Sequence, residues 1–172
     1  MFGICRPTSL TGLGKALSSC LVLVALVEPM TAQQPAPPLP TPGPTMADAL
    51  KALDMARAAA VRANLNLSCA VVDSRGDLVA LTRMDGARFF TADVARGKAQ
   101  LSAIFGQPSG NLAQFGATPA FSNFNATAQG RLFPIQGAVP IMRNSQVNGA
   151  IGCSGGTSQQ DEDAAKAGLA GF

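Results

Sequence analysis

The sequence lacks histidine, tyrosine and tryptophan altogether over its 172 residues. Without histidine, a Ser-His-Asp triad and a histidine-ligated zinc site are both excluded. Without tyrosine and tryptophan, every aromatic contact must come from the nine phenylalanines. The remaining residues show no activated nucleophile and no convincing acid–base pair. We therefore assign no catalytic residue, and the sequence leaves open whether the protein is an enzyme.

Charged residues are also scarce, at 13% of the chain, and the net charge is only +3. Such a balance provides no basic stripe of the kind that nucleic-acid binding requires, so we expect no nucleic-acid partner. Hydrophobic residues make up 47% of the chain. A small domain of this composition exposes apolar surface, which self-association would cover. The composition therefore favours a homo-oligomer.

The first part of the chain has the pattern of an export signal. Within residues 1–32, Arg6 and Lys15 precede a short apolar run, and Ala32 is a small residue at the expected cleavage position. The run is shorter than the roughly 20 residues that a membrane-spanning helix needs. Residues 33–44 are rich in proline and predict an extended linker. We expect a periplasmic or secreted protein with no membrane span after the signal is removed.

A single domain is expected over residues 45–172, and it contains two of the four cysteines, Cys69 and Cys153. In an oxidising compartment the two thiols can form a disulfide. Both cysteines lie in expected strands, however, where a buried cysteine more often packs as a small hydrophobic side chain. The sequence leaves the pairing open and favours unpaired cysteines.

The hydrophobic periodicity predicts an α+β domain, with a mainly antiparallel sheet layered between helices as an α/β/α sandwich. Several strand segments are apolar at successive positions, so both faces of the sheet need cover. The expected elements are a helix over 45–64 capped by Thr45, a hairpin of 67–73 and 78–84, a helix over 91–105 capped by Thr91, a long irregular loop over 106–136, a hairpin of 139–143 and 147–154, and a helix over 158–167 capped by Ser158.

Two helical positions carry specific expectations. Gly97 lies in the middle of a helix, where glycine costs about 1 kcal/mol relative to alanine, and this indicates close packing at that point. Arg96 and Lys98 flank Gly97 and are expected on a solvated face. Asp161 is expected to cap the last helix. It begins a run of three carboxylates that point to different sides of that helix, so no dedicated metal site is expected.

Several motifs, taken in order, resemble those of one family. They are Asp73-x-x-Gly76, Arg83-Met84-Asp85-Gly86-Ala87, Ala95-Arg96-Gly97-Lys98-Ala99, Gly137-Ala138-Val139-Pro140, and Gly149-Ala150-Ile151-Gly152-Cys153-Ser154-Gly155 followed by Asp161 and Ala165-Lys166-Ala167-Gly168. The chain is similar over 46–171 to the GlcG/HbpS-like haem-binding (haem-degrading) domain family, also found as the C-terminal domain of PduO proteins. It departs from the family pattern at two places. Cys153 stands where valine is usual, and Gln100-Leu101-Ser102 follows Ala99 where the family often has Arg-Thr-Ala. The resemblance implies an α/β/α domain that often forms oligomers, with haem as the cofactor.

Most of the phenylalanines fall between residues 89 and 133, and two interpretations of them stay open. They can form the flat apolar wall of a planar-ligand site, or they can form core and subunit contacts. Without histidine, an axial haem ligand would have to be Met84, Met142, a cysteine thiolate or a weak oxygen donor, and haem propionates would contact arginine or lysine. The candidate ligand-binding residues are Arg83, Asp85, Arg88, Phe89, Phe90, Arg96, Lys98 and Met142.

The sequence therefore predicts an exported domain that binds haem or a similar planar small ligand in an oligomeric assembly. Two alternatives remain. One is an enzyme acting on a small organic acid or a related metabolite, with Arg83, Asp85 and Lys98 as its polar groups. The other is a purely structural oligomer.

Overall fold

The computed structural model describes residues 43–172, so the expected signal peptide and most of the expected linker lie outside the described residues. The last two linker residues, Gly43 and Pro44, are described. Pro44 is fully buried, and its ring lies 3.2 Å from where a Cβ on Gly149 would be. A Cβ on Gly43 would lie 2.6 Å from the Cβ of Asp73. The packed part of the chain therefore includes these two residues.

The centre of the domain is a four-stranded antiparallel sheet in the order β2-β1-β4-β3. Its strands are β1 (Ser68–Asp73), β2 (Leu78–Arg83), β3 (Ala138–Arg143) and β4 (Gln146–Ser154). The β1–β2 turn is held by Asp73, whose Oδ1 accepts hydrogen bonds from the backbone N–H groups of Arg75 and Asp77 at 2.8 and 2.9 Å. Pro140 lies on the edge strand β3, where its missing N–H leaves no gap in the middle of the sheet.

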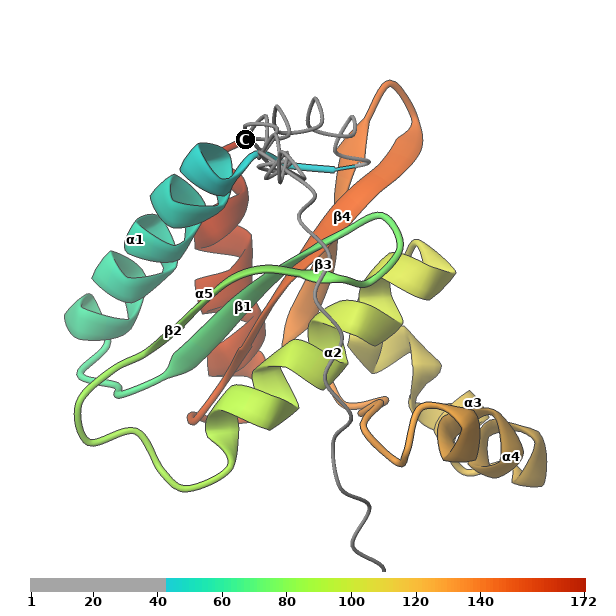
Figure 1. Ribbon diagram of the computed structural model, residues 1–172. Helices are drawn as coiled ribbons and strands as arrows, with labels where there is room; N and C mark the ends of the chain where they lie inside the picture. Colours follow the sequence, from blue (N-terminus) through green and yellow to red (C-terminus); the bar gives the residue numbers. More distant parts are fainter. Residues whose placement is uncertain (1–42) are drawn as a thin grey trace, which may run out of the picture. The chain divides into compact units, whose positions relative to one another are not determined.

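Three helices cover the two faces of this sheet: α1 (Met46–Arg62), α2 (Thr91–Phe105) and α5 (Ser158–Leu169). Figure 1 shows α1 and α5 together on one face and α2 on the opposite face. The predicted α+β sandwich is confirmed. Thr45 caps α1 as expected, because its hydroxyl accepts from the N–H of Asp48 while the Asp48 carboxylate accepts from the N–H of Thr45.

The two faces of the sheet have unequal cores. Large apolar side chains from α1, β1, β3 and β4 fill the space between the sheet and the helices α1 and α5, among them Leu53 of α1, Val71 of β1 and Ile151 of β4. On the other face, α2 contributes mainly alanines, and the buried cluster there is Val72, Ala99, Ala103 and Ala150. A Cβ on Gly152 would lie 2.6 Å from the carbonyl oxygen of Ala95. The backbone of α2 therefore lies almost directly on β4, as its alanine and glycine content allows.

The segment 106–136 is not the irregular loop that the sequence predicted. It forms the 3-10 helix η1 (Ser109–Leu112), the short helix α3 (Ala113–Gly116) and α4 (Pro119–Thr127), which Thr118 caps. It packs on α2 through a buried cluster of Leu101 from that helix with Leu112, Phe121 and Leu132. The rings of Phe105, Phe115, Phe121 and Phe124 pack mainly edge to face around this cluster. The core interpretation is therefore correct for Phe121, against which Phe115 and Phe124 pack partly buried.

Cys69 and Cys153 form a disulfide, so the unpaired state that the sequence favoured is wrong. The two residues lie directly opposite each other in the β1–β4 ladder, with their Cα atoms 4.1 Å apart. Both are buried on the face that α1 and α5 cover. Strand register brings the two thiols together, and register depends on contacts between parts of the chain 84 residues apart.

Among residues 43–172, none of the helices has the length and apolar character needed to cross a membrane.

Candidate functional site

A pocket of about 410 Å³ lies between α2 and the segment that follows α4. This volume falls in the range of about 300–1,000 Å³ that is usual for small-molecule sites. The residues that line it from the α2 side are Phe90, Asp93, Arg96 and Gln100, and those from the opposite side are Gln129, Gly130, Arg131 and Phe133. Asp93, Arg96 and Gln100 recur at intervals of three and four residues, so they lie on one face of α2, and Phe90 immediately precedes the helix.

The two walls of the pocket lie close together at Gly97, which has no side chain to separate them. A Cβ at this position would overlap the carbonyl oxygen of Arg131 and the ring of Phe133. The expectation of close packing at Gly97 is thus confirmed. It is the segment carrying Arg131 and Phe133 that approaches the helix there.

The wall opposite α2 is held by backbone geometry and by one side chain. Gln129 and Gly130 both have positive φ, 56° and 72°, which reverses the chain after α4. The amide of Asn125 donates to the carbonyl of Leu132 at 3.1 Å and accepts from the N–H of Leu132 at 2.9 Å. Because the Asn125 side chain binds both the N–H and the carbonyl of Leu132, the backbone from which the adjacent Arg131 side chain extends is held in place.

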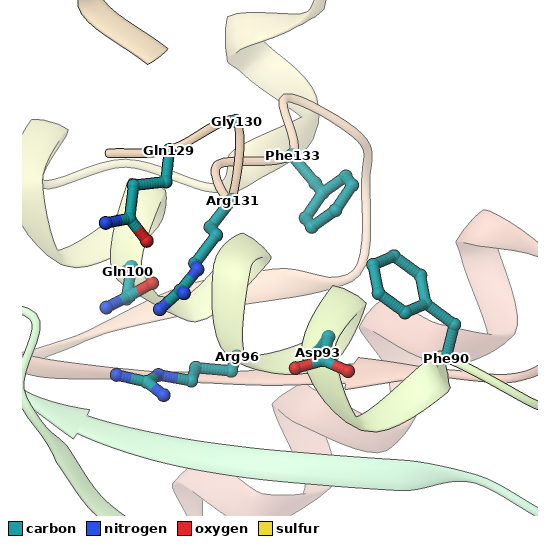
Figure 2. Close-up of a pocket in the computed structure, with 8 residues that line it drawn as sticks. All are labelled: Phe90, Asp93, Arg96, Gln100, Gln129, Gly130, Arg131 and Phe133. Carbon is teal, nitrogen blue, oxygen red and sulfur yellow. The ribbon is translucent and has the colours of Figure 1, made fainter. Parts of the chain in front are cut away.

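The pocket has an aromatic end and a cationic end. The rings of Phe90 and Phe133 pack edge to face with centroids 6.1 Å apart. Figure 2 shows these rings at one end, with the side chains of Arg96 and Arg131 reaching toward the other. Asp93 is the one carboxylate among the residues that line the pocket.

Both guanidinium groups are free to bind an anion. Within residues 43–172, neither Arg96 nor Arg131 forms an ion pair. The Nε of Arg96 is buried and, in the same part of the chain, has no hydrogen-bond partner. A buried donor without a partner is unfavourable, by about 1–3 kcal/mol, and a ligand carboxylate would satisfy it.

A second hollow of about 420 Å³ continues from the first along α2. The two share Arg96, Gln100, Gln129 and Arg131 as lining residues. The second reaches Arg75, whose guanidinium is already paired with Asp73 and Asp77, at 3.5 Å each. Together the two hollows form one groove with Arg96 and Arg131 at its middle.

Of the candidate residues taken from the sequence, Phe90 and Arg96 line the pocket. Phe89 is 93% exposed and stacks loosely on Phe90 with ring centroids 6.1 Å apart. Phe90 itself has a positive φ of 67°, which directs the chain from the β2–α2 connection into the helix. The predicted cap Thr91 is instead the first residue of α2, and its hydroxyl donates to the carbonyl of Arg88 at 2.8 Å.

Three other candidates lie outside the pocket lining: Arg83 is the last residue of β2, and Asp85 and Arg88 lie on the connection between β2 and α2. Arg83 donates to the carbonyl of Ala87 at 2.8 Å, and Arg88 donates to the carbonyl of Gly155 at 2.9 Å. The exposed Asp85 forms no ion pair with Arg83 among the described residues. The two arginines hold the connection in place.

Lys98 is not on a solvated face, and that expectation is wrong. It is 2% exposed, and its Nζ lies 2.8 Å from Oδ2 of Asp161 and 3.3 Å from the carbonyl of Cys153. Asp161 also accepts from the N–H of Gly156, so it joins α2 to α5 and does not cap the helix. The cap of α5 is Thr157, one residue before the predicted position.

The methionine candidates also lie outside the pocket lining. Met142 is 51% exposed on β3. The sulfur of Met84 accepts a hydrogen bond from the N–H of Leu67 at 3.4 Å.

The candidate list from the sequence lacked six of the lining residues, which are Asp93, Gln100, Gln129, Gly130, Arg131 and Phe133. Gln100 lies four residues after the candidate Arg96 on the same face of α2, and this spacing was the one local signal for it. Arg131 had none, because its place depends on the packing of 129–133 against Gly97.

Comparisons with known proteins agree with this architecture. A family model described as "Haem degrading protein HbpS-like" matches residues 45–170. An "Uncharacterized 15.0 kDa protein in dhaT-dhaS intergenic region" of Citrobacter freundii is 31% identical over 119 residues, which are 68% of this chain and 83% of that protein. The crystal structure of Klebsiella pneumoniae protein ORFY is 28% identical, with a TM-score of 0.68, over 83% of this chain and 97% of that one.

The crystal structure of a PduOC:heme complex shares the fold at 21% identity, with a TM-score of 0.68, over 76% of this chain and 95% of that one. The family model covers nearly all of the described domain. This chain therefore belongs to the HbpS-like family, described as that of a haem degrading protein.

Proposed function

We propose that this protein is an exported domain that binds haem, or a similar planar ligand, in the pocket between α2 and 129–133 and that works as an oligomer. The observation that carries the proposal is that one pocket contains two phenyl rings and two guanidinium groups that form no ion pair within residues 43–172. Haem has the complementary chemistry, since it joins a flat apolar macrocycle to two propionates.

Each part of the pocket fits one part of that ligand. The rings of Phe90 and Phe133 provide an apolar surface for the macrocycle. The guanidinium groups of Arg96 and Arg131 are suited to the propionates, because an arginine binds a carboxylate through two charge-assisted hydrogen bonds. The family description and the heme complex of PduOC, which has the same fold, support haem as the ligand.

The donor set limits how the iron is held. The sequence contains neither histidine nor tyrosine. The two cysteines of the described part are joined in a disulfide, so neither offers a thiolate there. Oxygen donors remain in the pocket on Asp93, Gln100 and Gln129. Bound haem would supply a redox-active iron, and these residues offer it only weak ligands.

A haem titration followed by absorbance tests the proposal. We expect saturable binding with a weak-field spectrum, unlike that of haem held by two histidines. Replacing Met142 should leave the spectrum unchanged, because this side chain is outside the pocket lining. Absorbance that rises without saturation would refute haem binding.

A second candidate is a site for a small organic acid, as in the enzyme alternative. Arg96, whose Nε has no partner within residues 43–172, can hold a small carboxylate together with Arg131 and Gln100, without the aromatic end. Thermal melts separate the two candidates. If the pocket binds haem, haem should raise the melting temperature. If it is a site for a small organic acid, members of a panel of small acids should raise the melting temperature and haem should leave it unchanged.

Export and assembly are the remaining parts of the proposal. Export rests on the signal pattern of residues 1–32 and is supported by the disulfide, which is typical of oxidising compartments. N-terminal sequencing of the secreted protein should begin near Gln33, and a protein that retains Met1 in the cytoplasm would contradict export. Assembly is supported by exposed apolar side chains such as Phe89 at 93% and Val61 at 57%. Light scattering should show at least a dimer. A monomer that is stable at micromolar concentration would contradict assembly.

A further inference from the structure

We infer that the pocket recognises the carboxylate edge of its ligand and not the metal, so that its ligand class is the dicarboxylic porphyrins, metal-free members included. This inference rests on the proposed function and narrows it to a chemical class.

The cationic end is built in advance. Arg131 follows two residues of positive φ, and the Asn125 amide holds its neighbour Leu132 through two hydrogen bonds. Arg96 projects from the middle of α2 toward the same end of the pocket (Figure 2). The backbone is fixed on both sides, and the planar guanidinium group loses less conformational entropy per hydrogen bond than a lysine ammonium group does.

The cationic charge in the pocket is not neutralised from within. Asp93 lies in the same lining, but neither Arg96 nor Arg131 forms an ion pair with it in the described part of the chain. The Nε of Arg96 is buried without a partner there, so a ligand carboxylate completes its hydrogen bonding. Two carboxylates on one edge of a ligand match the two guanidinium groups.

The opposite end offers the macrocycle contact but no strong metal ligand. Phe90 and Phe133 have no donor atom, and the other lining residues offer only carboxylate, amide and guanidinium groups. The Met84 sulfur accepts from Leu67, and Cys69 and Cys153 are oxidised. Removing the metal from a porphyrin therefore removes little of the binding energy, whereas masking its carboxylates removes much of it.

The test compares haem, metal-free protoporphyrin and protoporphyrin dimethyl ester on the same protein. The protein has no tyrosine or tryptophan, so the porphyrin's own absorbance and fluorescence report binding without interference from the chain. We expect similar dissociation constants for haem and protoporphyrin and a dissociation constant about 10- to 100-fold higher for the diester.

Two variants and a control assign the effect to residues. Arg96→Gln and Arg131→Gln should each weaken protoporphyrin binding about 10-fold or more while leaving diester binding nearly unchanged. Arg57→Gln is the matched control, since it also removes one positive charge but lies on α1 in an exposed pair with Asp54. Thermal melts without ligand check that each variant is folded.

The outcomes separate the inference from the proposed function. Saturable haem binding with much weaker protoporphyrin binding would overturn the inference, because the metal would then dominate, and haem binding itself would stand. Equal binding of the acid and the diester would also overturn it. If no porphyrin binds saturably, the proposed haem site fails together with the inference.

Discussion

At the scale of single residues, the buried pair of Lys98 and Asp161 is the clearest structural feature. Both side chains are almost fully buried, at 3% and 4% exposure, with Nζ and Oδ2 2.8 Å apart. The lysine also donates to the carbonyl of Cys153, and the aspartate accepts from the N–H of Gly156. One pair thus links α2, β4 and the start of α5.

We expect Lys98→Met to lower the free energy of unfolding by about 3–5 kcal/mol, because it leaves the Asp161 carboxylate buried without its counter-ion. The double variant Lys98→Met/Asp161→Asn should recover part of this loss, since no unpaired charge remains and the amide oxygen can still accept from Gly156. Urea denaturation of both variants measures the difference. A single variant as stable as the wild type would show that the pair contributes nothing.

Gly97 provides a second test at the scale of one residue. Alanine favours a helix interior by about 1 kcal/mol over glycine, so Gly97→Ala would stabilise an isolated helix. In this fold the added methyl group would overlap the Arg131 carbonyl and the Phe133 ring. We therefore expect destabilisation by about 1–3 kcal/mol together with weaker porphyrin binding. Stabilisation with unchanged binding would show that 129–133 does not pack on α2 as described.

At the scale of elements, α2 has different functions on its two sides. The side against the sheet is built from small residues such as Ala95, Ala99 and Ala103, which let β4 approach closely. The opposite side carries Asp93, Arg96 and Gln100 and forms one wall of the pocket. A change on the sheet side should therefore alter stability first, and a change on the pocket side should alter binding first.

At the start of α5 the sequence predicts Ser158 as the helix cap, whereas the structure has Thr157 in that role. The hydroxyl of Thr157 accepts from the N–H of Gln160, and the side chain of Gln160 accepts from the N–H of Thr157 at 2.9 Å. We expect Thr157→Ala to destabilise the protein by about 1 kcal/mol. Ser158→Ala is the matched control and should change stability by no more than about 0.5 kcal/mol. Thermal denaturation of the two variants measures the difference in stability. A larger loss of stability in Ser158→Ala than in Thr157→Ala would show that Ser158 is the cap, as the sequence predicted.

At the scale of the whole molecule, the disulfide joins two central strands that come from opposite ends of the domain. Cys69 and Cys153 close a loop with a sequence separation of 84 residues. We expect Cys69→Ala/Cys153→Ala to lower the free energy of unfolding by about 2–5 kcal/mol, whichever model of disulfide stabilisation holds. Denaturation with and without reductant provides the measurement. The wild type should lose stability in reductant and the variant should not; equal responses would argue against the pairing.

The sequence alone was enough to predict the elements with long or distinctive local patterns. The bounds of α2, the Thr45 cap of α1 and the two hairpins follow from periodicity, capping residues and turn residues. The missing histidine excluded whole classes of site before any fold was known. Helix bounds, caps and turns depend on interactions between residues close together in the chain, so a short stretch of sequence is enough to predict them.

Only the tertiary structure decided the rest, because it depends on residues distant in the chain. Strand register placed Cys69 opposite Cys153, and helix packing buried Lys98 against Asp161. The short helices of 106–136 have too few turns for a clear period, and the Phe121 cluster that stabilises them forms only on folding. The pocket exists because Gly97 allows a segment more than thirty residues away to reach α2, a contact that no local pattern encodes.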